Sequence, residues 1–248
     1  MKSFSLILVS VVVATCVGCT VRHSSGTATE TAPSPSPTPA TLKSEPTEAT
    51  TKPAGAATIP SEIKTAGFEY YGLSNTKPLS MKGLVTGARR TGAWVNSLVG
   101  FDSNKATYEQ RFTGTLSELG VNRVTADKSG IYATSVSGYV LDKPQLELPA
   151  DPQPGFTWKF NVTIKGSNQE SILDSGTDKI VGMKKVTAGG KSYDALLVEE
   201  SGSLTGGGNT ANVTARKWLV KGLGPVRQEI HSESQGKKQD IVLEASGS

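Results

Sequence analysis

The sequence predicts an all-β domain of about ten mostly antiparallel strands. Apolar and polar residues alternate along much of residues 61–248, glycine-rich turns separate the alternating stretches, and no stretch longer than about ten residues has helical periodicity. The clearest case is 156–164, where every second residue is apolar: Phe156, Trp158, Phe160, Val162 and Ile164. Because successive side chains of a strand point to opposite faces, this segment predicts a strand with one buried face.

Shorter stretches with the same alternation predict the other strands. They cover residues 68–73, 93–99, 107–115, 121–126, 131–136, 180–186, 192–200, 211–220, 226–232 and 240–244. The glycines at 189–190 predict a tight hairpin turn, residues 206–209 predict a longer flexible loop, and residues 222–225 break the chain again. Strands joined by such short turns are expected to pair as antiparallel hairpins.

A sheet with this many strands is not expected to stay flat, because strands twist and long open sheets curl or split into two layers. A curved sheet that forms a half-barrel or a barrel is therefore predicted, and a two-layer β-sandwich is the alternative. Residues 195–198 are apolar on both faces of their strand, which predicts at least one centrally buried strand.

The N-terminal segment, residues 1–18, has the layout of a secretory signal peptide. Lys2 is followed by an apolar run at 4–17 and then by small residues up to Cys19. The run is short for a bilayer-spanning helix, which needs about 20 residues. The end of the segment, Val17-Gly18-Cys19, resembles the lipobox of bacterial lipoproteins. That resemblance implies cleavage before Cys19 and attachment of acyl chains such as palmitate to it, with Cys16 as the reserve site.

Residues 19–60 begin with the lipidated cysteine and continue as a predicted disordered tether. Thr, Ser, Ala and Pro dominate this stretch, which has too few large apolar side chains to build a core. Residues 61–248 are long enough for a single domain with a substantial core. Both cysteines of the chain precede it, so the domain contains neither a disulfide nor a thiol.

The location of the protein follows from the anchor. By the sorting rules of lipoproteins, Thr20 after the modified cysteine predicts the outer membrane in a host with two membranes. In a host with one membrane, the protein is expected on the outer face of the plasma membrane. The net charge of +4 is spread along the domain without a basic stripe, so nucleic acid is not an expected partner.

Catalytic residues are hard to find in the domain. His231 is its only histidine and is interpreted as an exposed surface residue, because no serine-presenting motif accompanies it. Asp174 and Asp178 are interpreted as parts of a turn, and Glu199 and Glu200 as neighbours on opposite faces at a strand end. The domain is therefore expected to be no enzyme and to hold no metal or cofactor, although an envelope hydrolase that uses these carboxylates is an alternative.

Large aromatic side chains offer the one candidate ligand site. They are either core residues or the lining of a cavity for an apolar ligand or a lipid tail. The set is Trp94, Tyr108, Phe112, Phe156, Trp158, Phe160 and Trp218.

The segment Trp218-Leu219-Val220-Lys221-Gly222-Leu223-Gly224-Pro225-Val226-Arg227 resembles the LolA and LolB group of half-barrel lipoprotein carriers and other secreted β domains that share its strand, glycine-rich turn and charged strand. This resemblance implies a half-barrel that carries or senses an apolar ligand. Together with the anchor, the sequence favours a lipid-anchored envelope protein that presents a non-enzymatic binding or interaction domain. Its expected partners are the membrane and either another envelope protein or an apolar ligand.

Overall fold

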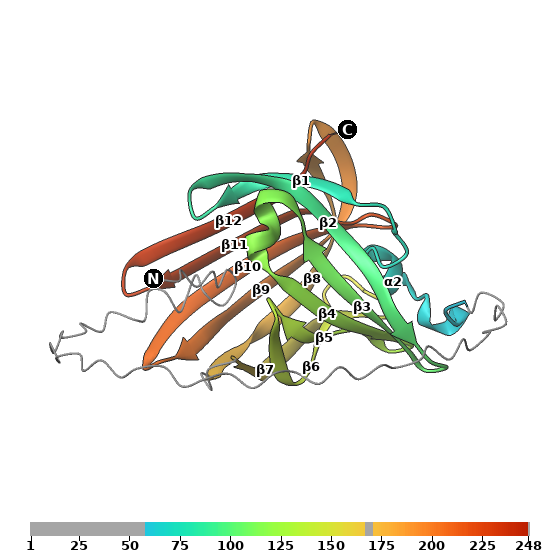
Figure 1. Ribbon diagram of the computed structural model, residues 1–248, viewed down its shortest axis with the longest axis horizontal. Helices are drawn as coiled ribbons and strands as arrows, with labels where there is room; N and C mark the ends of the chain where they lie inside the picture. The colour runs from blue at the N-terminus through green and yellow to red at the C-terminus, as the bar shows by residue number, and fades with distance from the viewer. Residues whose placement is uncertain (1–57, 167–170, 248) are drawn as a thin grey trace, which may run out of the picture. The chain divides into compact units, whose positions relative to one another are not determined.

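The computed structural model describes residues 58–166 and 171–247. Within these ranges twelve strands form one closed antiparallel barrel, in which each strand pairs with its sequence neighbours and β1 pairs with β12 to close the ring (Figure 1). The predicted all-β class and the predicted barrel are confirmed, and the two-layer sandwich is not formed. Closure leaves no unpaired sheet edge of the kind that an open sheet exposes.

The strands are longer and more numerous than the alternation indicated. Their bounds are β1 Leu79–Val85, β2 Ala88–Phe101, β3 Lys105–Phe112, β4 Val121–Asp127, β5 Gly130–Val136, β6 Tyr139–Pro149, β7 Thr157–Lys165, β8 Ser171–Ala188, β9 Lys191–Gly206, β10 Asn209–Val220, β11 Gly224–Ser234 and β12 Lys237–Ala245. Strands β1 and β6 were not predicted. Three short helical elements accompany the strands: η1 Ser61–Ile63, α2 Ala66–Tyr70 and η2 Gly114–Leu119.

Two predicted turns are wrong or different in kind. Residues 174–178 lie inside β8, so Asp174 and Asp178 belong to a strand and not to a turn. Residues 206–209 form a tight hairpin turn and not a long loop, because Gly206 pairs with Asn209 across Gly207 and Gly208, both of which have positive φ. The predicted turn at 189–190 is confirmed: Ala188 pairs with Lys191.

The strand predicted at 68–73 is instead helix α2 and the turn after it. The Thr65 hydroxyl accepts a hydrogen bond from the Phe68 backbone N–H at 3.2 Å and caps the start of the helix. Gly72, with a φ of 75°, follows the helix in the left-handed region that glycine favours. Such a short alternating stretch is ambiguous between strand and helix, and the tertiary position decided it.

Helix α2 closes one end of the barrel (Figure 1). Phe68, on this helix, is 1 % exposed and meets the ring of Tyr108 edge to face, with 5.9 Å between ring centroids. Backbone hydrogen bonds join Gly67 N–H to the Ala150 carbonyl at 2.8 Å and Gly222 N–H to the Glu69 carbonyl at 2.9 Å. The helix and β-strands from several sides of the barrel thus share one apolar cluster, which fills this end.

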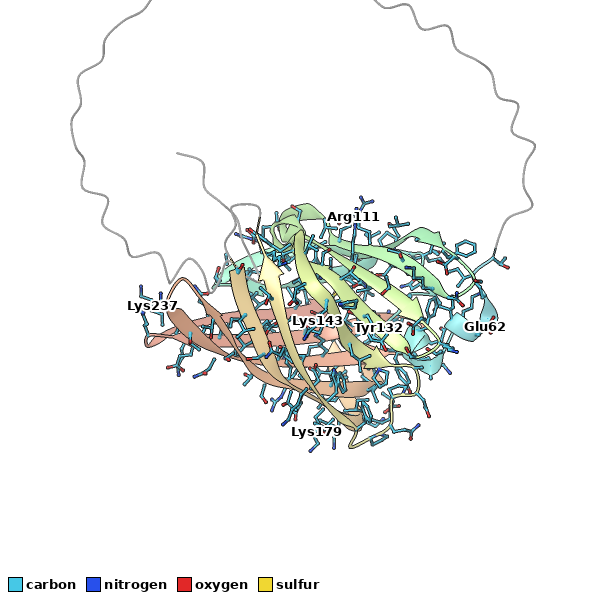
Figure 2. The ribbon with its side chains drawn as sticks, turned by 90° about the horizontal axis from the view of Figure 1, so that it is seen from below. Glu62, Arg111, Tyr132, Lys143, Lys179 and Lys237 are labelled. Carbon is cyan, nitrogen blue, oxygen red and sulfur yellow. The ribbon has the colours of Figure 1, made fainter. Side chains whose placement is uncertain are left out.

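The opposite end is partly covered by η2. Leu116 and Leu119 from this element pack with Trp94 and Phe112 in a second apolar cluster. A third cluster lies between β5, β6 and β7 to β10 and includes Val162. In Figure 2, Glu62 and Lys237 mark the two ends, while Arg111, Lys143 and Lys179 project from the outer surface. No helix in the described ranges has the length and apolarity that crossing a membrane requires.

The barrel wall is weakest between β6 and β7. These strands pair only through Val140 with Lys165 and Leu141 with Ile164, near one end of the seam. Farther along, side chains join them: the Trp158 indole Nε1–H donates to the Leu146 carbonyl at 2.9 Å. The wall next to Glu147 is therefore held partly by side chains instead of by a continuous backbone ladder.

Candidate functional site

A cavity of about 130 Å³ lies inside the barrel between the two covered ends. One part of its lining is apolar and includes Trp94, Phe112, Leu119, Val124, Ala133, Val136, Leu219, Pro225 and Ile230. The other part is polar and consists of Tyr71, Asn122, Ser135, Gln145, Glu147, Asp174, Glu200, Lys217 and Gln228. A concave site with an apolar wall and a few convergent polar groups is the usual form of a small-molecule site.

One lysine stands at the centre of the polar wall. The Nζ atom of Lys217, on β10, donates to Oε2 of Glu147, on β6, at 3.0 Å, and the Tyr71 hydroxyl donates to the same oxygen at 3.1 Å. The side chains of Lys217 and Glu147 are only 29 % and 13 % exposed. A charge pair this well removed from bulk water is strongly coupled, and the loss of either partner would leave a buried charge.

Three more carboxyl groups face the barrel interior near this pair. Asp178 on β8 is the direct cross-strand partner of Glu200 on β9, and Glu200 in turn pairs with Ala215 on β10. Asp174 is on the same face of β8 as Asp178, because the two are four residues apart and strand side chains alternate. Residues that the sequence placed in a turn and at a strand end thus meet on three neighbouring strands.

Burial shifts the ionisation of this group. It raises the pKa of Asp178 to about 8 and that of Asp174 to about 7, and the negative charge of Glu200 adds to both rises. Burial also raises the pKa of Glu200, against the pull of Lys217. For Lys217, burial lowers the pKa, but the carboxylates of Glu147 and Glu200 outweigh it and hold the pKa well above its usual value.

Tyr71 stays a hydroxyl at any moderate pH. Burial raises its pKa well above the usual value, and the carboxylate of Glu147 raises it further. Near neutral pH the site therefore contains a charged lysine, a phenol that donates to Glu147 and a set of carboxyls that share few protons among them.

The apolar wall contains one unmatched donor. Trp94, on β2, is 6 % exposed and lines the cavity. Its ring meets that of Phe112 edge to face, with centroids 4.9 Å apart. Its indole Nε1 is buried and has no hydrogen-bond partner among the described residues. Buried indole N–H groups usually find an acceptor, so this one marks a place where a ligand oxygen fits.

The structure divides the seven aromatic residues that the sequence singled out. Trp94 and Phe112 line the cavity. Tyr108 packs under the helix α2 and Trp158 packs against the same cluster. These two are core residues at the closed end and do not line the cavity.

The other three lie elsewhere for reasons of strand alternation and packing. Phe160 is 8 % exposed and fills the space left by its cross-strand partner Gly176. Phe156 precedes β7 and is 44 % exposed. Trp218 follows Lys217, so it faces outward, where the Arg227 guanidinium lies 5.7 Å from its ring centroid. The cavity is therefore less aromatic than the sequence indicated.

Other candidate residues also have clear positions. His231 is exposed, as predicted, and its Nδ1 lies 2.7 Å from Oδ1 of Asp240. Glu199 and Glu200 do point to opposite faces, but in the middle of β9: Glu199 accepts from Arg216 Nε at 3.0 Å. Cys16, Cys19 and nearly all of the predicted tether lie outside the described residues.

Sequence reasoning missed the residues at the centre of the site, Tyr71, Glu147 and Lys217. A signal was present for Lys217, because it interrupts the apolar face that Ala211, Ala215 and Leu219 form on β10. A charged residue on the buried face of a strand indicates an internal polar site. Within residues 58–166 and 171–247, no group of three or more His, Cys, Asp or Glu side chains is arranged to hold a metal ion.

The fold has counterparts among solved structures. A candidate lipoprotein from Parabacteroides distasonis matches with a TM-score of 0.51 and 11 % identity, over 71 % of this chain and 97 % of that one. A candidate exported protein with a YmcC-like fold from Bacteroides fragilis matches with 9 % identity over 68 % of this chain and 93 % of that one, at a TM-score of 0.37, too low to indicate a shared fold. No protein-family model and no curated protein matches the sequence. At such identities, the first likeness shows a common fold alone.

Proposed function

We propose that this chain is a lipid-anchored binding protein of the cell envelope, and that its barrel takes up a small ligand in the internal cavity. The observation that carries the proposal is the cavity itself, with a charged wall around Lys217 and an apolar wall around Trp94. A closed barrel that served only as a scaffold gains nothing from buried, uncompensated carboxyls, because each one costs free energy. Such a cost is typical of functional sites.

The envelope location is supported by the N-terminal segment. The lipobox-like end at Cys19 and the Thr20 that follows it favour an acyl anchor on the outer side of a membrane. The similar barrel from Parabacteroides distasonis belongs to a candidate lipoprotein, which agrees with such an anchor. The long Ser/Thr/Pro-rich stretch would then hold the barrel away from the bilayer.

The size of the cavity favours a small molecule over a lipid tail. Its volume of about 130 Å³ is close to that of an engineered cavity of about 150 Å³ that holds benzene. A complete acyl chain requires much more room, so the lipid-carrier alternative needs a larger opening than this one. The proposal includes no catalytic residue, since the exposed His231 stands apart from the carboxyls that line the cavity.

The test is to identify what the cavity holds. Full-length protein is purified without harsh washing and analysed by native mass spectrometry, and the small molecules released on denaturation are compared between variants. Ala133→Leu fills the cavity from β5, while Thr134→Leu changes the next residue, on the outer face. We expect a small molecule with wild type and with T134L that A133L lacks.

Ser135→Val is a milder second variant should A133L fail to fold, since Ser135 also lines the cavity. If wild-type protein and both cavity variants release the same small molecules, and no small amine, alcohol or hydrocarbon binds to any of them in solution, the proposal is wrong.

A further inference from the structure

We infer that the cavity is a site for a small organic ammonium ion that carries a neutral oxygen at its other end, such as a short-chain amino alcohol. The inference rests on the proposed function and names its ligand class. Two independent observations support it: the unbalanced carboxyls of the polar wall and the unmatched indole donor of the apolar wall.

The polar wall lacks cations. Lys217 is the only Lys or Arg among the residues that line the cavity, and its ammonium already pairs with Glu147 at 3.0 Å. Glu200 and Asp174 line the same cavity, and Asp178 lies beside Glu200, so these three carboxyls have no lysine or arginine of their own there. A second cation, supplied by a ligand, would compensate them.

An ammonium group fits this position better than a hydrated metal ion. Hard cations require six or more oxygen ligands around them, whereas one side of the cavity consists of Leu, Val, Ala, Ile and aromatic side chains. An organic ammonium places its charge among the carboxyls and its carbon chain against those apolar groups. The ring faces of Trp94 and Phe112 also tolerate a nearby cation.

The far end of the ligand is defined by Trp94. Its Nε1–H can only donate, so it requires an oxygen acceptor. A carboxylate at that end would need a cation, and the polar residues that line the cavity besides the charged group are Tyr71, Asn122, Ser135, Gln145 and Gln228. A hydroxyl or ether oxygen is therefore the matching group. The volume of about 130 Å³ limits the chain to roughly four carbons.

Binding of such a cation should release protons. The charged and titratable groups at this place are Tyr71 after α2, Glu147 on β6, Asp174 and Asp178 on β8, Glu200 on β9 and Lys217 on β10. An entering ammonium ion favours the ionised form of the carboxyls, several of which hold protons near neutral pH because burial raises their pKa. Affinity is then expected to rise from pH 6 to pH 8.

The experiment is isothermal titration calorimetry of the full-length protein at pH 8 with four matched probes. They are 4-aminobutan-1-ol, butylamine without the oxygen, 1,4-butanediol without the charge, and 4-aminobutanoate with a second charge. We expect 4-aminobutan-1-ol to bind most tightly and 1,4-butanediol and 4-aminobutanoate to bind at least about tenfold more weakly, because a charge-assisted hydrogen bond is lost or an unpaired charge is buried. Butylamine should lie about fivefold below the amino alcohol.

Two variants assign the ends of the ligand. Glu200→Gln should weaken the binding of 4-aminobutan-1-ol about tenfold, while the neighbouring outward control Glu199→Gln leaves it unchanged. Trp94→Phe should reduce the affinity for the amino alcohol to that for butylamine, without changing the affinity for butylamine. A general loss of structure would not produce this selective pattern.

The outcomes separate this inference from the proposed function. If 1,4-butanediol binds as tightly as the amines, or if E200Q leaves amine binding unchanged, the ammonium assignment is wrong while the cavity is still a ligand site. If no probe binds but wild-type protein releases a different molecule that A133L lacks, the ammonium assignment is again wrong and the proposed function stands. If no probe binds and no such molecule is found, both fail.

Discussion

Asp178 and Glu200 are direct cross-strand partners on the inner face of the barrel, where Asp178 is only 5 % exposed. Like charges placed directly opposite each other on a sheet are destabilising, and burial increases that cost. The chain tolerates the pair because burial and the charge of Glu200 raise the pKa of Asp178 to about 8, so that Asp178 keeps its proton near neutral pH.

This relationship predicts how stability depends on pH. The pKa of Asp178 is higher in the folded state than the ordinary value of 3.8, so the folded state binds the proton more tightly. Its contribution to stability is complete at low pH and is lost as the pH rises from about 4 to about 8, by up to roughly 5 kcal/mol at about 1.4 kcal/mol per pKa unit. Asp178→Asn should remove much of this loss and raise the urea midpoint at pH 8 far more than at pH 5.

Asp194→Asn is the control for that measurement, because its side chain is 70 % exposed. It should change the midpoint little at either pH. An Asp178→Asn variant whose stability still declined with pH as steeply as that of wild type would show that Asp178 is ionised in the folded protein.

The Lys217–Glu147 pair should behave as a buried ion pair. Lys217→Met leaves Glu147 without its cation, and we expect a loss of about 3–5 kcal/mol in the free energy of unfolding. The double variant Lys217→Met/Glu147→Leu removes both charges and should recover most of that loss. Denaturant titrations of the single and double variants provide the measurement.

The matched control for this pair is Lys185→Met. Lys185 forms an ion pair with Asp194 at the same N to O distance of 3.0 Å, but the two side chains are 78 % and 70 % exposed. Its loss should cost less than about 1 kcal/mol. Equal effects at Lys217 and Lys185 would mean that solvent screens the internal pair as well.

Helix α2 should contribute to barrel stability through one side chain. Phe68→Ala removes a ring that is 1 % exposed and is expected to cost about 3–5 kcal/mol. Tyr70→Ala, on the same helix but only partly buried, should cost clearly less. Thermal unfolding followed by circular dichroism distinguishes the two variants, and similar losses at both positions would show that the helix acts through its backbone contacts instead.

Gly176 should be intolerant of a side chain. An added Cβ would lie 2.6 Å from Cζ of Phe160 and 2.9 Å from Cα of Gly202, so Gly176→Ala should cost about 1–3 kcal/mol. Gly100→Ala is the control, because a Cβ there meets nothing within 4 Å. Urea denaturation compares them, and a G176A variant as stable as G100A would mean that Phe160 moves aside without cost.

The lipid anchor is tested by the two cysteines of the N-terminal segment. Cys19→Ser should abolish incorporation of radiolabelled palmitate and release the protein from the membrane fraction, because no acyl chain is then attached. Cys16→Ser should leave both unchanged. Labelling that is lost in C16S and kept in C19S would move the anchor to the reserve site.

The amount of fold that the sequence determines is clear from particular strands. The alternation from Phe156 to Ile164 correctly predicts β7, and the glycines at 189–190 correctly predict the hairpin between β8 and β9. The strand at 68–73 failed because six residues cannot separate a period of two from a helical period. The turn predicted at 174–178 failed because Asp, Ser, Gly and Thr favour turns locally, and the pairing of β8 with both neighbours overrode that preference.

The sequence by itself determined the β class, the hairpin order, the absence of thiols from the domain and the lipobox-like end at Cys19. Only the tertiary structure decided that the sheet closes, because closure depends on the pairing of β1 with β12 at opposite ends of the domain. It also decided which polar residues face inward. Tyr71, Glu147, Glu200 and Lys217 are far apart in the chain, and they meet only because barrel closure turns one face of every strand toward a shared interior.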